Sequence, residues 1–177
     1  MANDWFRLQL DLDAFDESPF LANLARSRAT GIRFESFASL GDRDDNRRKL
    51  YELNKACSRD IPNRGEFYTF EDYVAQRIDV PSFMPSGVII ALDGDDWIGM
   101  CALSDHLEQE YMFVEMTGVR AEYRQRGISM AMKVLALRCA RSTGATSIRT
   151  FHDRENNPAI GANEKLGFRP VTRAQTS

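Results

Sequence analysis

The spacing of apolar and polar residues along the chain predicts an ordered series of strands and helices. Period-two alternation and short apolar runs bounded by turn residues are typical of β-strands, whereas apolar residues that recur every three or four positions are typical of helices. The first pattern predicts strands at residues 5–12, 32–37, 88–92, 97–103, 111–119, 147–151 and 168–172. The second predicts helices at residues 20–29, 42–58, 70–78, 127–142 and 156–166.

The order of these elements predicts a mixed α/β fold. A helical front precedes a hairpin whose arms, 88–92 and 97–103, enclose a turn of Asp and Gly residues. A third strand, 111–119, extends the hairpin into an antiparallel meander, after which strands and helices alternate. We therefore expect a main domain over residues 31–177, preceded by a strand and a helix within residues 1–30.

Two local patterns bear on how the chain packs. Pro81 and Pro85 are expected to prevent regular secondary structure immediately before the hairpin, because proline lacks the N–H group that a sheet needs. The helix 127–142 has the clearest amphipathic pattern, with Lys133 and Arg141 expected on its back, away from the core. Its expected buried face consists of Ile128, Ala131, Met132, Leu135 and Cys139.

The composition is that of a folded domain. With 43% hydrophobic and 28% charged residues in a chain of 177, there are enough apolar side chains for a core, and disorder is not expected. The longest uncharged apolar run, 87–92, is far shorter than the roughly 20 residues of a membrane span. Residues 1–6 lack a signal-peptide pattern. We expect a soluble, cytoplasmic protein with no membrane partner.

Charge and cysteine content narrow the candidate partners further. A formal net charge of −3 gives no reason to expect a nucleic acid as partner. The three cysteines have no C-x-x-C spacing, and together with two histidines they make a poor ligand set for zinc. We therefore expect no metal site and no nucleic-acid partner, and any phosphate binding must be local.

The junction between the strand 111–119 and the helix 127–142 has the features of a phosphate site. A helix N-terminus offers free N–H groups and the positive end of the helix dipole, and Gly127 lets an anion approach the backbone. Arg124 and Arg126 add positive charge that suits a diphosphate. An ordinary basic loop that caps a helix would show the same short pattern. Neither a P-loop nor a three-glycine dinucleotide fingerprint is present.

Two motifs in this region give the chain its resemblance to a known family. Arg124-x-x-Gly127-x-Ser129 resembles the Q/R-x-x-G-x-G/A signature of the GNAT superfamily of N-acetyltransferases. The segment from Asn156 to Phe168 is similar to the family's second signature, N-x-x-(A/M)-x-x-x-(Y/N)-E-K-L-G-F. The resemblance covers residues 32–172. Its details are most similar to one half of the tandem-domain, mycothiol-synthase-like members.

This resemblance implies a fold, a cofactor and a reaction. The fold would be a mixed, mostly antiparallel sheet flanked by helices, with a V-shaped opening between strands 111–119 and 147–151 for acetyl-CoA. The reaction would be direct transfer of an acetyl group to a primary amine of a small molecule or peptide. Residues 5–12 resemble the last strand of a preceding domain, and we expect them to complete the sheet, either within this chain or in a homodimer.

The resemblance also implies roles for particular residues. Backbone groups of Gly118 and Val119 would bind pantetheine, and the N–H groups of residues 125–129 would hold the pyrophosphate. Ser129 stands where the family has Gly or Ala, and Asn156 has the alternative role of a helix N-cap. The residues implied to bind the cofactor are Thr117, Gly118, Val119, Arg124, Gln125, Arg126, Gly127, Ile128, Ser129, Asn156 and Asn163.

Acetyl transfer to an amine also needs groups that move protons. The ammonium form of the acceptor must lose a proton, and Glu115 is the best candidate for the base. Period-two alternation places it on one face with Thr117 and Val119, and an ion pair with an arginine is the alternative role.

The departing thiolate needs a proton, which the resemblance would assign to a tyrosine at the position that Asn163 occupies here. Asparagine cannot donate that proton. Tyr111, Tyr123 or solvent would have to replace it. His152 lies where the strand 147–151 ends and could face the cleft, with a structural role as the alternative. Alternatively, the domain is a catalytically weak or inactive acyl-CoA-binding or interaction domain.

Overall fold

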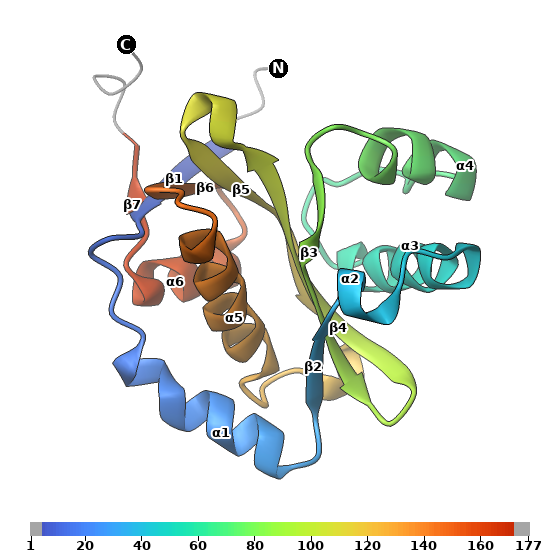
Figure 1. Ribbon diagram of the computed structural model, residues 1–177, viewed down its shortest axis with the longest axis horizontal. Coiled ribbons are helices and arrows are strands. Elements are labelled where there is room, and N and C mark those ends of the chain that lie inside the picture. The colour runs from blue at the N-terminus through green and yellow to red at the C-terminus, as the bar shows by residue number, and fades with distance from the viewer. Residues whose placement is uncertain (1–4, 172–177) are drawn as a thin grey trace.

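A seven-stranded sheet forms the centre of the protein, and helices cover both of its faces (Figure 1). The structure is a computed structural model that describes residues 5–171. The strands lie in the order β2-β3-β4-β5-β6-β1-β7, and β5–β6 is the parallel pair among antiparallel neighbours. The strands are β1 (Trp5–Asp11), β2 (Arg33–Ser36), β3 (Phe83–Asp93), β4 (Asp96–His106), β5 (Tyr111–Val119), β6 (Ser147–Asp153) and β7 (Arg169–Pro170). The predicted fold class is confirmed.

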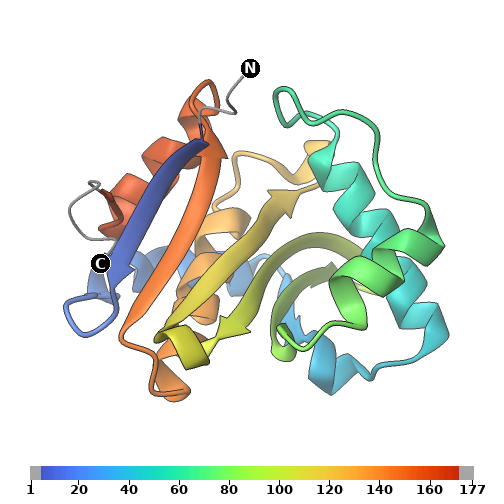
Figure 2. The ribbon, with the colours of Figure 1, turned by 90° about the horizontal axis from the view of Figure 1, so that it is seen from above.

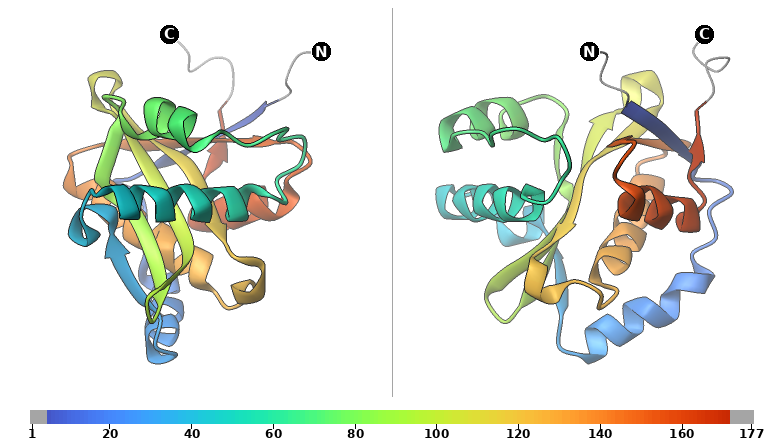
Figure 3. Two further views of the ribbon diagram at one scale, coloured as in Figure 1. Left: turned by 90° about the vertical axis from the view of Figure 1, so that its right-hand side faces the viewer. Right: turned by 180° about the vertical axis from the view of Figure 1, so that it is seen from behind.

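The helices form two layers, one on each face of the sheet (Figures 1 and 3). One layer holds α3 and α4, and the other holds α5 and α6, with α1 packed beside α5. The helices are α1 (Leu21–Ala29), α2 (Phe37–Leu40), α3 (Asp44–Ser58), α4 (Phe70–Tyr73) with a π-helical continuation η2 (Val74–Ile78), α5 (Ile128–Ser142) and α6 (Asn157–Leu166). Single 3₁₀ turns are η1 (Ser18–Phe20), η3 (Leu107–Gln109) and η4 (Ala121–Tyr123).

Two apolar layers result from this arrangement, because the central strands are buried on both faces. In β3, Ile89 and Ala91 pack toward α5, whereas Val88, Ile90 and Leu92 pack toward α3. A strand covered on both sides is apolar at every position rather than at every second one. This explains the uninterrupted apolar run from which the strand was predicted.

The opening in the sheet lies between β5 and β6. These parallel strands pair only at their first residues, where Tyr111, Met112 and Phe113 face residues 147–149. Beyond that point the two strands move apart, and Figure 2 shows them as the two sides of a V. The predicted V-shaped opening is therefore present at the predicted place.

The strand β1 completes the sheet within the chain. It pairs with β6 from Trp5↔Asp153 to Asp11↔Ser147, and its other edge pairs with β7 (Figure 2). The side chains of Leu8 and Leu10 in this strand, and of Leu12 directly after it, are buried. The strand therefore lies between β6 and β7 rather than at the outer edge. Its origin in a preceding domain and the formation of a homodimer remain predictions.

The expectation for Pro85 was wrong. The strand β3 begins at Phe83 and passes through this proline, in a stretch where the pairing with β4 shifts register between Phe83 and Val88. A proline fits where the ladder is already interrupted, because its missing N–H breaks no hydrogen bond there.

The expected faces of the helix α5 were also wrong. Lys133 is buried, whereas Leu135 and Cys139 are only half-buried. Because α5 packs against β3, β4, β5 and α1 together, more than one side of the helix is covered, and a single apolar stripe does not describe it.

The burial of β1 predicts that its leucines contribute strongly to stability. Leu8 is completely buried, so Leu8→Ala should lower the free energy of unfolding by about 2–5 kcal/mol. The control Leu21→Ala removes a leucine that is 41% exposed on α1 and should change it by about 0.5 kcal/mol or less. Urea denaturation measures both, and equal effects would contradict the integration of β1 into the core.

Candidate active site

The two facing edges of the V offer backbone groups without a strand partner. At the closed end, the Thr150 hydroxyl donates a hydrogen bond to the Val114 carbonyl at 3.3 Å. Beyond it, the ladder of residues 5–171 contains no further pair between β5 and β6. Backbone groups inside a fold are normally hydrogen-bonded, so this opening suits a ligand that carries amide groups. Pantetheine is such a ligand.

The loop at the open end of the V has the geometry of an anion-binding site. Gln125 and Gly127 both have left-handed backbone conformations, with φ of 62° and 75°. Within the described residues, the N–H groups of residues 125–130 donate no hydrogen bond, and no side chain caps α5. Such a turn at the start of a helix presents N–H groups and the positive end of the helix dipole to an anion.

Position 127 requires a glycine for two reasons, its left-handed backbone conformation and the lack of space for a side chain. A Cβ atom at this position would lie 2.0 Å from Asn23 Oδ1 of the helix α1. Asn23 Nδ2 donates a hydrogen bond to the Gly127 carbonyl at 2.8 Å. The helix α1 therefore holds the loop in place, a role for Asn23 that the sequence did not indicate because the two residues are far apart in the chain.

The two arginines of the loop make contacts with the protein. Arg124 forms an ion pair with Asp60 at 2.7 Å, and its Nε donates to the Val119 carbonyl at 3.2 Å. Arg126 donates to the Glu122 carbonyl and lies over the Tyr123 ring. Both side chains are exposed. These contacts hold the loop in shape, and a charge contact with a diphosphate remains a prediction.

The remaining cofactor candidates lie along the V and at its ends. Gly118 allows α3 to approach, because a Cβ atom there would lie 2.6 Å from Cys57 Cβ. Val119 is buried in the core, whereas Ser129 is half-buried in the first turn of α5, directly after the buried Ile128. Asn156 occupies the N-cap position of α6, but its side chain caps no N–H group.

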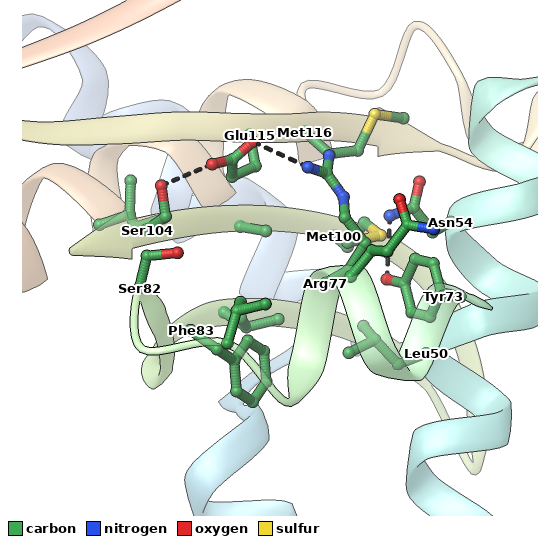
Figure 4. A pocket seen from close by; sticks show the side chains of 15 residues that line it. Leu50, Asn54, Tyr73, Arg77, Ser82, Phe83, Met100, Ser104, Glu115 and Met116 are labelled. Carbon is green, nitrogen blue, oxygen red and sulfur yellow. Dashed lines mark hydrogen bonds and ion pairs between the residues drawn. The ribbon is translucent and has the colours of Figure 1, made fainter. Parts of the chain in front are cut away.

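Glu115 lies on the face of the sheet that α3 and α4 cover (Figure 4). The pairing of β4 with β5 shifts here, since Ala102 faces Met116 and Leu103 faces Val114, which leaves Glu115 as an extra residue. This bulge breaks the alternation, so the expectation that Glu115 shares a face with Thr117 was wrong. Thr117 instead contacts Cys101 on the α5 side.

The Glu115 carboxylate borders a cavity of about 60 Å³ (Figure 4). Ser104 Oγ donates a hydrogen bond to Glu115 Oε1 at 2.6 Å, and Arg77 Nη1 lies 3.4 Å from Oε2. The side chain is 28% exposed. The ion pair foreseen as an alternative is therefore formed, and the carboxylate still faces the cavity. Other residues that line it include Asn54, Tyr73, Ser82 and Phe83.

On the opposite face, a buried polar cluster lies beside the closed end of the V. Asn163 Oδ1 accepts a hydrogen bond from Lys133 Nζ at 2.5 Å, and Asn163 Nδ2 lies 2.6 Å from His152 Nε2. Burial lowers the pKa of Lys133 to about 8. Burial, with a smaller effect of Lys133, lowers the pKa of His152 to about 4. The sequence did not indicate Lys133, because its position looked like the back of a helix.

The two tyrosines considered as proton donors lie elsewhere. The Tyr111 ring is stacked against His106 at the start of β5, and the Tyr123 hydroxyl donates to Asp93 at 2.8 Å. Neither lines the small cavity beside Lys133 and Asn163.

Within residues 5–171, no helix is long and apolar enough to cross a membrane, and no three His, Cys, Asp or Glu side chains group to hold a metal ion. A cytoplasmic location stays a prediction.

Comparison with known families tests the assignment that this geometry suggests. Residues 47–168 match the model of the acetyltransferase (GNAT) family. The chain belongs to this family. Acetyl-CoA is the acetyl donor of these enzymes, which confirms the predicted cofactor class.

Sequence relatives include mycothiol acetyltransferases. The protein of that name from Corynebacterium glutamicum (strain R) is 30% identical over 107 residues, which are 60% of this chain and 36% of the relative. That from Thermobispora bispora is 28% identical over 143 residues, or 78% of this chain and 46% of the relative. The chain spans less than half the length of the curated relatives it matches, from 29% to 46%, and the predicted resemblance to one half of such proteins is confirmed.

Solved structures show the same fold at low identity. The ribosomal-protein-S18-alanine N-acetyltransferase from Escherichia coli has a TM-score of 0.62 at 11% identity, covering 80% of this chain and 79% of its own. A GCN5-related N-acetyltransferase from Sphaerobacter thermophilus has a TM-score of 0.64 at 18% identity, covering 94% and 48%. A chain of the NatC complex bound to Gag peptide and CoA has a TM-score of 0.60 at 18% identity, covering 80% and 86%.

The buried lysine predicts a specific pH dependence of stability. Lys133 loses its proton near pH 8 in the folded protein and near pH 10.5 in the unfolded chain. Between these values the unfolded chain holds more protons, so the free energy of unfolding should rise with pH, by about 3 kcal/mol from this group. Lys133→Met should lack this rise.

Denaturation at a series of pH values measures the difference between wild type and Lys133→Met, which cancels the titrating groups that do not interact with Lys133. Lys165→Met, which removes an exposed lysine of α6, is the control and should follow wild type. Parallel stability curves for wild type and Lys133→Met would contradict the burial of a titrating ammonium.

Proposed function

We propose that the protein is an acetyl-CoA-dependent N-acetyltransferase that moves an acetyl group directly to a primary amine of a small molecule or peptide. The observation that carries this proposal is the place of Glu115. The carboxylate sits at a bulge directly after Val114, which closes the V, and it faces a cavity on the other side of the sheet. A donor in the V and an acceptor in the cavity would therefore meet beside this carboxylate.

The backbone of the chain suits the donor. The N–H groups of residues 125–129 would hold the pyrophosphate, and the open edge of β5 at Gly118 and Val119 would bond the pantetheine amides. When bound, acetyl-CoA supplies an acetyl group activated as a thioester. Asn23 supports this site indirectly, because its hydrogen bond to Gly127 fixes the turn.

Glu115 has the chemistry that the acceptor requires. A primary amine with a pKa near 10 is mostly charged at neutral pH and must lose a proton before it attacks. Ser104 donates to one carboxylate oxygen and Arg77 lies near the other, so the side chain is oriented. A cavity of about 60 Å³ has room for water that carries the proton to solvent, or for the amine end of an acceptor.

The cysteines support direct transfer rather than an acyl-enzyme route. Burial raises the pKa of the Cys57 thiol to about 11, and it also raises the pKa of Cys101 and Cys139. A nucleophilic cysteine needs the opposite shift, because the thiolate is the attacking form.

The cavity offers the proposed amine acceptor one positively and one negatively charged side chain. Its charged lining residues are Arg77 and Glu115. The acidic stretches 42–45, 93–96 and 108–110, which would suit a cationic acceptor, do not line it.

Binding of the cofactor is tested by thermal unfolding with acetyl-CoA, ATP or NAD. Acetyl-CoA at about a hundredfold excess over its dissociation constant should stabilise the wild type by about 3 kcal/mol, or roughly 5–10 °C. Gly127→Glu should lose this shift, because the side chain meets Asn23 and places a carboxylate in the anion site.

The matched control is Gly144→Glu at the other end of α5. Gly144 also has a left-handed conformation, with φ of 85°, but a Cβ atom there meets nothing within 4 Å. This variant should keep the acetyl-CoA shift. An equal shift for Gly127→Glu and wild type would contradict the assigned pyrophosphate site.

The role of Glu115 is tested by Glu115→Gln and the rate of thiol release from acetyl-CoA across a panel of amines. The variant should lower kcat by about 10²–10⁴ while retaining the acetyl-CoA thermal shift. Glu108→Gln, at an exposed position in η3, is the control and should keep full activity.

Full turnover of Glu115→Gln across the pH range would remove the assignment of this base. If acetyl-CoA stabilises the wild type but no amine of a broad panel releases thiol, the alternative of an acyl-CoA-binding domain without turnover is favoured.

A further inference from the structure

Lys133 is a buried cation without an anionic partner. It is 7% exposed, and its hydrogen bond goes to the neutral amide oxygen of Asn163. None of the ion pairs among residues 5–171 includes it. Burying an ammonium without a counter-ion is costly. A buried lysine of this kind therefore either carries no charge or serves to stabilise an anion that forms beside it during a reaction.

The position of Lys133 indicates where that anion would form. The side chain lines a small cavity together with Val114 of β5, Ile148 of β6 and Asn163 of α6. Val114 also closes the V through its bond with Thr150, and the next residue is Glu115. Lys133 and Glu115 therefore flank the closed end of the V from opposite faces of the sheet.

Asn163 is held in one orientation by His152. The pKa of His152 is lowered to about 4 by burial, so its imidazole is neutral at pH 7. A neutral Nε2 accepts a hydrogen bond from Asn163 Nδ2, which turns Oδ1 toward Lys133. The resulting chain of hydrogen bonds fixes the ammonium at the end of the V.

We propose that the Lys133 ammonium stabilises and protonates the thiolate released in acetyl transfer, with Asn163 and His152 as positioning residues. This inference rests on the proposed function and deepens it. As the N–C bond forms, the C–S bond breaks and its electron pair goes to sulfur. Lys133 Nζ gives the proton that makes the thiol and regains one from water. The two protons lost by the ammonium of the acceptor leave on the side of Glu115.

The other groups around Lys133 do not neutralise it. Cys101 Sγ, on β4, interacts with Thr117 Oγ1 at 3.4 Å, and burial raises the pKa of its thiol, so it stays uncharged at neutral pH. His152 on β6 is neutral and Asn163 on α6 carries no charge. The positive charge of Lys133 therefore stays available to the sulfur.

The test is the pKa of the thiol of coenzyme A bound to the protein, followed by the ultraviolet absorbance of the thiolate. The thiolate and the Lys133 ammonium stabilise each other, so the two groups titrate as a coupled pair. Bound to wild type, the thiol should therefore titrate about one pH unit below free coenzyme A, a tenfold higher thiolate-to-thiol ratio at a given pH. Lys133→Met should abolish this shift. Asn163→Asp should abolish it as well, because a carboxylate of the same shape would pair with the ammonium.

Further variants separate positioning from folding. His152→Gln retains an oxygen that accepts from Asn163 Nδ2 and should keep most of the shift, whereas His152→Leu should lose it. Lys165→Met, exposed on α6, should behave as wild type.

Two results would overturn the inference. If coenzyme A binds wild type and Lys133→Met with the same thiol pKa, the proposed role of Lys133 is wrong and the acetyltransferase proposal stands. If coenzyme A binds neither wild type nor Lys165→Met, both proposals fail together.

Discussion

The parallel pairing of β5 and β6 over only three residue pairs is the constraint on which the rest of this structure depends. Each strand is secured on its outer edge, β5 by β4 and β6 by β1, so the two can separate without leaving the sheet. A parallel ladder that continued would have used the backbone groups that the V leaves open. Because it stops at Phe113, the sheet has a slot in its middle, with one end closed at Val114 and Thr150.

The residues of the proposed reaction lie at the closed end of this slot, because two departures from regular structure meet there. The bulge in β5 turns Glu115 toward α3 and α4, where Arg77 and Ser104 contact its carboxylate. The helix α5 lies across the other face and brings Lys133 to the same end. A carboxylate and a buried ammonium thus lie on opposite sides of one point in the sheet, which suits a reaction that removes protons on one side and forms a thiolate on the other.

The front of the chain supports the site from two directions. The strand β1 occupies the edge of β6 that faces away from the V, which keeps β6 in place after it leaves β5. The helix α1 then brings Asn23 to the carbonyl of Gly127, which fixes the turn that presents the N–H groups. The contact from α1 therefore supports the loop before α5, whose first turn has no side-chain cap.

The sequence by itself determined most of the elements, the mixed sheet and the place of the glycine-containing loop before α5, because these follow from local spacing. Locally determined features include the Thr69 side chain, which caps α4, and Gly167, which ends α6 in the left-handed conformation. Lys133, Asn23 and the bulge at Glu115 were decided only by the tertiary structure. The face that Glu115 occupies depends on one extra residue against the neighbouring strand, and the burial of Lys133 depends on α1, α6 and the sheet enclosing α5 together. Such contacts join residues far apart in the chain, so no local pattern carries them.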